Sequence, residues 1–181
     1  MDFTGRLYFD FTSPEVWRFY RMLTAAQQEG ARIGLEWKPF VVGGLDGATA
    51  GQRRLLQASE VIRQDVPLRH GGFVPAILTA IHDEGASADD PELIVVACRV
   101  AGLDEDLVDD VSIDGPGRVL LERSQAEAET LGVDAVPTLY RHGPVLTVRT
   151  TGAAALGGAA ARLETIDRVL DDDGLWELRK P

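Results

Sequence analysis

The chain has 181 residues, 45% of them hydrophobic, which suffices for one domain with a substantial core or for a small domain with a large insertion. Its formal net charge of −11 disfavours binding to nucleic acid or to anionic membrane surfaces. No apolar run reaches the roughly 18 residues that a membrane-spanning helix needs, and the first residues lack the pattern of a signal peptide. We therefore expect a cytoplasmic protein that binds neither nucleic acid nor membranes.

Residues 6–11 alternate in polarity and predict a strand that ends before Ser13 and Pro14. Serine is a good helix N-cap and proline suits the first helical position, so a helix is predicted over 14–29. A second alternating stretch, residues 33–39, predicts another strand. A crossover of this length implies two parallel strands with the helix on one face of the sheet.

Residues 41–48 are rich in glycine and predict a loop. The next sixty residues contain no β-rich run, and glycines and prolines divide them into short helical patterns. The predicted helices cover residues 49–64, 75–84, 91–101 and 104–110. We interpret this region as a helical insertion.

The last third of the chain predicts a helix over 117–131, a hairpin of strands over 136–140 and 145–149, and a final helix over 153–172. The order is then β–α–β, several helices, and β–β–α. This order predicts an α/β, thioredoxin-like fold. Residues 1–41 and 114–181 would form the thioredoxin-like domain, and residues 42–113 an inserted helical domain.

A single cysteine, Cys98, excludes a disulfide framework and a cysteine-rich zinc site. It lies in an apolar stretch, which favours an inert buried thiol over a redox role. The three histidines show no metal-ligand spacing, so we expect no metal. All basic residues except Lys38 and Lys180 are arginines, which is typical of a high-GC bacterium.

Three stretches resemble landmarks of the DsbA-like family. Residues 9–14 resemble the strand end that leads into Cys-Pro-x-Cys, and residues 132–138 resemble Gly-Val-x-Gly-Val-Pro-Thr, whose proline is normally cis and faces the active site. Residues 37–40, followed by two glycines, resemble the second strand of the same group. The resemblance covers essentially the whole chain and implies a DsbA-like fold.

Ser13 and Val16 stand where the two cysteines of that motif would be, so the chain has no redox-active dithiol. Ser13-Pro14 is most similar to the branch of 2-hydroxychromene-2-carboxylate isomerases and kappa-class glutathione transferases. The resemblance implies that Ser13 hydrogen-bonds the sulfur of bound glutathione. The bias toward arginine adds mycothiol as an alternative thiol, since many high-GC actinobacteria use it instead. It also implies a homodimer, as in the kappa class.

The remaining candidate site residues are those expected to contact the bound thiol or the substrate. The backbone of Val136, before Pro137, would bind a peptide-like thiol in the manner of a strand edge. Thr151, at the start of the last helix, would bind a carboxylate of that ligand. Trp17 and Phe40 are expected to line the substrate pocket.

Simpler interpretations stand beside these. Ser13 is equally well explained as a helix N-cap. For Thr151 the N-cap interpretation is the favoured one, and for Pro137 the favoured role is to shape its loop. The favoured function is a thiol-dependent transferase or isomerase that acts on a small aromatic or quinone-like substrate. The alternative is a non-catalytic DsbA-like binding protein, which the missing cysteines and a carboxylate at Glu15 favour, because that charge would oppose a nearby thiolate.

Overall fold

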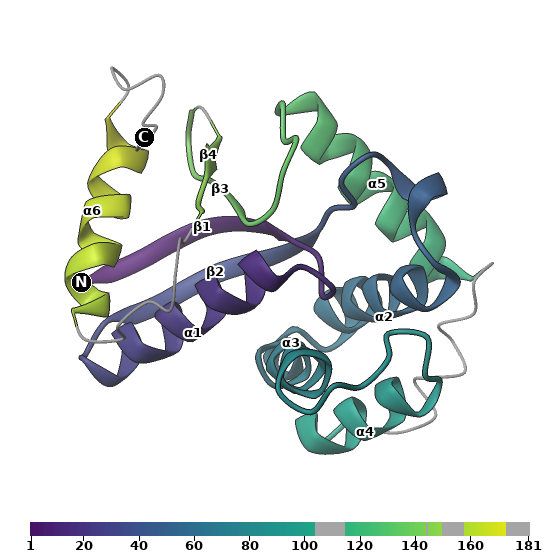
Figure 1. Cartoon of the computed structure of the whole chain (residues 1–181). Coiled ribbons are helices and arrows are strands. Elements are labelled where there is room, and N and C mark those ends of the chain that lie inside the picture. The colour runs from purple at the N-terminus through teal and green to yellow at the C-terminus, as the bar shows by residue number, and fades with distance from the viewer. Residues whose placement is uncertain (104–114, 144, 150–157, 173–181) are drawn as a thin grey trace.

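The computed structural model of the chain describes residues 1–103, 115–143, 145–149 and 158–172. These residues form a mixed sheet with strand order β2-β1-β3-β4 (Figure 1). The strands are β1 (Asp2–Phe9), β2 (Arg32–Pro39), β3 (Thr138–Tyr140) and β4 (Leu146–Thr147). β1 runs parallel to β2 and antiparallel to β3, and β3 and β4 form the predicted antiparallel hairpin.

Helices cover both faces of this sheet. On one face, α1 (Pro14–Gln28) and α6 (Ala159–Asp171) bury Phe3 and Leu7 of β1. On the other face, α5 (Pro116–Thr130) packs against the fully buried side chain of Tyr8. The alternation predicted for the first strand is therefore confirmed, since successive side chains of β1 enter opposite cores.

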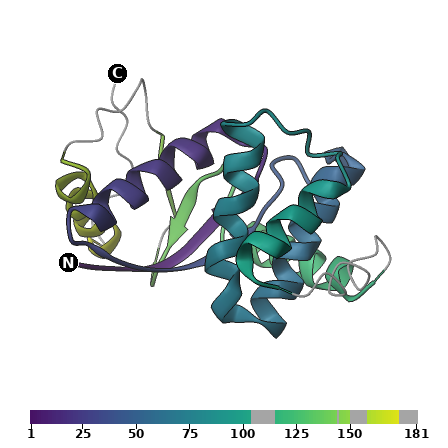
Figure 2. The same cartoon turned by 90° about the horizontal axis from the view of Figure 1, so that it is seen from below.

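The helices of the middle region gather beyond one end of the sheet, at the opposite end from α6 (Figure 1 and Figure 2). They are α2 (Ala50–Asp65), α3 (Pro67–His82) and α4 (Glu92–Ala101), preceded by a short 3₁₀ turn, η1 (Leu45–Gly47). Their apolar side chains share one buried cluster with Phe9, Phe11 and Val16, which lie where β1 passes into α1. The thioredoxin-like fold with inserted helices is confirmed, whereas its division into two domains stays a prediction.

Helix α3 differs from its prediction, because it begins at Pro67 rather than at residue 75. The sequence suggested breaks at Pro67 and at Gly71 and Gly72. However, a Cβ atom at Gly72 would lie 3.4 Å from Cα of Ala101, so the glycine allows α3 to approach α4 closely. Burial of α3 against its neighbours outweighs the low helix propensity of these residues.

The remaining differences concern the ends of elements. β1 begins at Asp2 and ends at Phe9, so the residues before Ser13 belong to a loop. The strand predicted over 136–140 begins at Thr138. The helix predicted over 104–110, the first residues of the helix predicted over 153–172, and Thr151 lie outside the described residues. Of the helices that are described, none is long and apolar enough to cross a membrane.

Candidate functional site

Ser13 ends the loop that joins β1 to α1. Its backbone is extended, with φ −80° and ψ 117°, and its Oγ accepts a hydrogen bond of 3.4 Å from the N–H of Val16. Pro14 follows as the first helical residue, so Ser13 is the predicted N-cap. The Ser13 hydroxyl is half-buried and donates no hydrogen bond to any residue that the structure describes. Its proton therefore stays available at the positive end of the helix dipole.

Asp10 anchors the loop between β1 and α1 through hydrogen bonds. Its carboxylate is only 7% exposed, and one oxygen accepts hydrogen bonds from the N–H and the hydroxyl of Thr12 at 2.9 and 3.0 Å. The other oxygen accepts from the side-chain amide of Gln52 in α2. Burial raises the pKa of Asp10, while these donors oppose the rise. The backbone C=O of Asp10 accepts from the N–H of Ser13 at 3.2 Å.

A second contact from the insertion reaches the same loop. His82, the last residue of α3, donates from Nε2 to the carbonyl of Phe11 at 2.8 Å. Its ring also stacks on the indole of Trp17, with the ring centroids 5.8 Å apart and the planes 11° apart. The loop before Ser13 is thus held by α2 on one side and by α3 on the other.

Glu15 carries a negative charge in the first turn of α1. Its carboxylate forms an ion pair with Arg18, one turn further along the same helix. An acidic side chain is favourable at this end of a helix, for the same reason that a thiolate would be. The pairing with Arg18 offsets part of the charge that a thiolate beside Ser13 would meet.

The second landmark lies beside this loop. The Val136–Pro137 peptide bond is cis, as the resemblance to the DsbA-like family implied. Because β1 and β3 pair Tyr8 with Thr138, residues 136 and 137 lie at the end of β1 where the Asp10 loop begins. The Val136 side chain packs against the buried cluster that contains Val16.

The backbone of Val136 is suited to a ligand. Its N–H and C=O form no hydrogen bond with another described residue, whereas the C=O of the neighbouring Pro137 accepts from Val148 at 2.9 Å. Backbone groups next to a strand generally need a partner, and an extended peptide-like ligand supplies both a donor and an acceptor.

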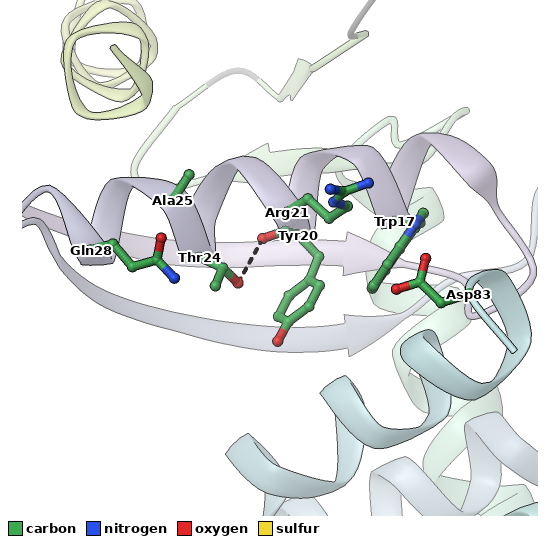
Figure 3. Close-up of a pocket in the computed structure, with 7 residues that line it drawn as sticks. All are labelled: Trp17, Tyr20, Arg21, Thr24, Ala25, Gln28 and Asp83. Atoms are coloured by element: carbon green, nitrogen blue, oxygen red, sulfur yellow. Dashed lines mark hydrogen bonds between the residues drawn. The ribbon is translucent and has the colours of Figure 1, made fainter. Parts of the chain in front are cut away.

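A groove of about 360 Å³ runs along the outer face of α1 (Figure 3). Trp17 and Tyr20 stack within it, their centroids 5.5 Å apart, and the guanidinium of Arg21 lies 6.0 Å from the centre of the Trp17 ring. The other lining residues are Thr24, Ala25, Gln28 and Asp83. Trp17 follows Ser13 by four residues, so the groove lies on the helix face that begins with Ser13.

The sequence-predicted residues fall in different places. Trp17 lines the groove and follows Ser13 by four residues, whereas Ser13 itself is not among the lining residues. Phe40 is 3% exposed and packs with Tyr8 and Val133 in the core under α5, on the other face of the sheet. Among the described residues no group of three or more His, Cys, Asp or Glu side chains could hold a metal ion.

Gln52, His82 and Asp83 were missed by sequence reasoning. They lie in the insertion, about forty to seventy residues after Ser13, and nothing in a single sequence links them to the loop. Arg21 had a usable signal, because it follows Ser13 and Trp17 at helical spacing.

No protein-family model matches the chain, and no curated protein matches its sequence. Solved structures do match. A 2-hydroxychromene-2-carboxylate isomerase aligns with a TM-score of 0.70 and 16% identity, over 93% of this chain and 94% of that one. A variant of Pseudomonas aeruginosa DsbA aligns at 0.64 and 17%, over 93% and 85%. A putative protein disulfide isomerase from Nitrosomonas europaea aligns at 0.64 and 14%, over 93% and 98%. The fold is therefore the DsbA-like thioredoxin fold, in a chain with one cysteine.

Proposed function

We propose that this protein uses a low-molecular-weight thiol to catalyse an isomerisation or a transfer on a small organic substrate. The observation that carries the proposal is the Ser13 hydroxyl, which caps α1 and keeps its own proton available. A dithiol mechanism has no basis here, because the only thiol, that of Cys98, is 1% exposed in α4.

The thiol is expected to bind between the N-terminus of α1, at Ser13, and the backbone of Val136. A free thiol has a pKa of about 8.5, and the N-terminus of a helix lowers that value and favours the thiolate. Ser13 donates a hydrogen bond to the sulfur, and the Val136 backbone pairs with a peptide-like thiol such as glutathione. Mycothiol is the second candidate, and Thr151 stays a predicted partner for a ligand carboxylate.

The substrate is expected to enter from the side of the α1 groove. Trp17 and Tyr20 offer aromatic surface one to two turns from Ser13, which suits a small planar molecule. The thiolate adds to one carbon of an electron-poor double bond of the substrate, and the π electron pair of that bond moves to the neighbouring atom. In a transferase that atom takes up a proton from water and the C–S bond is kept, whereas in an isomerase the double bond forms again after rotation and the thiolate leaves unchanged. One structural neighbour is by its name an isomerase, which supports the second outcome.

The alternative function is a non-catalytic binding protein. Glu15 favours it, since this carboxylate already occupies the positive end of α1. In that case Ser13 acts only as a helix cap. A cytoplasmic location and a homodimer belong to the main proposal, and light scattering of the purified protein tests the dimer.

Calorimetric titration with glutathione, and separately with mycothiol, tests the proposal. We expect binding by the native protein and a loss of up to about tenfold in affinity for Ser13→Gly, the worth of one hydrogen bond. Glycine is the informative replacement, because it caps a helix nearly as well as serine does but has no hydroxyl.

Ser13→Thr is the matched control, since it keeps both the hydroxyl and a capping side chain. It should bind the thiol more tightly than Ser13→Gly does. If neither thiol binds at millimolar concentration, or if Ser13→Gly binds as the native protein does, the proposal fails and the non-catalytic alternative holds.

A further inference from the structure

The loop of residues 10–13 is fixed by a contact from outside the thioredoxin-like part of the chain. We propose that Gln52, in the first turn of α2, is a positioning residue that holds residue 13 in place through Asp10. That this positioning serves catalysis rests on the function proposed above. The positioning itself depends only on the contacts among Gln52 and residues 10, 12 and 13.

The link begins at the side-chain amide of Gln52. Its nitrogen donates to one carboxylate oxygen of Asp10 and lies 3.5 Å from the hydroxyl oxygen of Thr12. Asp10 then holds Thr12 through its other oxygen and Ser13 through its backbone carbonyl. A continuous chain of hydrogen bonds therefore runs from α2 to the N-terminus of α1.

Burial makes this link strong. Asp10 is only 7% exposed, and a buried carboxylate needs donors on both oxygens. Within the described ranges, Gln52 supplies the donor to the oxygen that Thr12 does not bind. Without Gln52, the Asp10 side chain is expected to turn toward water and to release Thr12, which loosens the backbone that leads to Ser13.

Gln52 also has a second, purely structural task. Its side-chain oxygen accepts from the N–H of Thr49 at 3.3 Å, and the Thr49 hydroxyl accepts from the N–H of Gln52 at 3.1 Å. This reciprocal pair is the capping box of α2. A test must separate the stability of α2 from the contact with Asp10.

Two variants make that separation. Gln52→Met removes the capping contact and the contact with Asp10 together. Thr49→Ala removes the hydroxyl half of the same capping box but leaves the Gln52 amide on Asp10. Thr49→Ala also removes the hydrogen bond from the Thr49 hydroxyl to Asp89, so it weakens the start of α2 at least as much. An effect of Gln52→Met that Thr49→Ala does not reproduce is then not explained by a weaker start of α2.

A reporter thiol at residue 13 provides the measurement. Ser13→Cys places a thiol at the end of α1, and Cys98 is buried, so an alkylating reagent reports on residue 13. The pH dependence of the alkylation rate gives the pKa of the reporter. In the Ser13→Cys background, Gln52→Met should raise this pKa and lower the thiolate fraction at neutral pH by up to about threefold, the equivalent of about half a pH unit. Thr49→Ala should leave both unchanged.

The proposal is overturned if Gln52→Met leaves the pKa of the reporter unchanged, or if Thr49→Ala raises it equally. If Gln52→Met does not fold, Gln52→Asn replaces it, because the shorter amide keeps its polarity but cannot span the gap to Asp10. The reporter needs neither a bound thiol nor a substrate. Failure of the proposed function would appear as absent thiol binding, with the response of the reporter to Gln52→Met intact.

Discussion

At the scale of single residues, Ser13 combines two roles on one oxygen atom. The lone pairs accept the N–H of Val16 and so cap α1, while the hydroxyl proton is left for another partner. Capping therefore does not compete with a contact to a bound sulfur. The two interpretations that the sequence leaves open are compatible, and only a variant that keeps the cap and removes the hydroxyl can separate them.

His70 is a second residue whose surroundings lead to a prediction. It is 6% exposed in α3, and its Nε2 lies 2.8 Å from the hydroxyl of Ser59 in α2. Burial, aided by the positive charge of Arg63, lowers the pKa of His70 to about 4. The folded protein therefore keeps this imidazole neutral at a pH where the unfolded chain, with a pKa near 6.5, binds a proton.

The sign of the pH effect follows from this difference. Above pH 6.5 His70 is neutral in both states and costs no free energy of unfolding. As the pH falls from 6.5 toward 4, only the unfolded chain binds the proton, so the free energy of unfolding decreases. Between about pH 7 and pH 5, the loss attributable to His70 is on the order of 2 kcal/mol. Urea unfolding of the native protein and of His70→Gln at both pH values measures it. An equal loss in both proteins would contradict the assignment to His70.

At the scale of elements, α1 and α6 share an apolar core, and one carboxylate adds a polar link between them. Glu29, the C-cap residue of α1, accepts hydrogen bonds from the N–H groups of Gly158, Ala159 and Ala160 at 3.0, 3.3 and 2.8 Å. These groups are the orphan donors of the first turn of α6, which has no side-chain cap of its own. The donors lower the pKa of Glu29, with that of Ala160 the largest cause.

Glu29→Ala should therefore loosen the first turn of α6. We expect faster hydrogen exchange at the amides of residues 158–160 and a lower midpoint of thermal unfolding. The contribution of Glu29 is present above the normal carboxyl pKa and is lost as the pH falls through the lowered one. Gln27→Ala, two residues earlier on the exposed end of α1, is the control. Unchanged protection in Glu29→Ala would show that the cap is dispensable.

At the scale of the whole molecule, the sheet and the inserted helices share one core. The buried cluster that contains Phe9 and Val16 continues into α2, α3 and α4, and the ring of Phe73 in α3 meets that of Phe11 at 6.3 Å. A shared core predicts that both parts unfold together. Tryptophan fluorescence, which includes Trp17 and Trp37, and far-ultraviolet circular dichroism should then give coincident transitions in urea.

Phe73→Ala sharpens this prediction. It removes a fully buried ring and should lower the free energy of unfolding by about 3–5 kcal/mol, moving both transitions equally. Leu68→Ala, in the same helix but at a position that is 96% exposed, should change the free energy by less than about 0.5 kcal/mol. Transitions that separate in Phe73→Ala would show that the insertion unfolds on its own.

The sequence by itself determined the order of the elements and the place of Ser13. Periodicity and capping depend on neighbours a few residues apart, so the first strand, α1 and the cap at Ser13 were predictable. The cis proline at 137 followed from the resemblance of a short motif. Helix α3 was predicted too short, because the close approach of Gly72 to Ala101 of α4 exists only in the folded protein.

Only the tertiary structure decided what surrounds Ser13. It brings Gln52 and His82 from the insertion onto the loop of residues 10–13, and it separates Trp17 in the groove from Phe40 in the opposite core. The physical reason is distance along the chain. Local patterns record the helix or strand to which a residue belongs, whereas contacts between residues forty or seventy positions apart arise only when burial of the shared core brings those elements together.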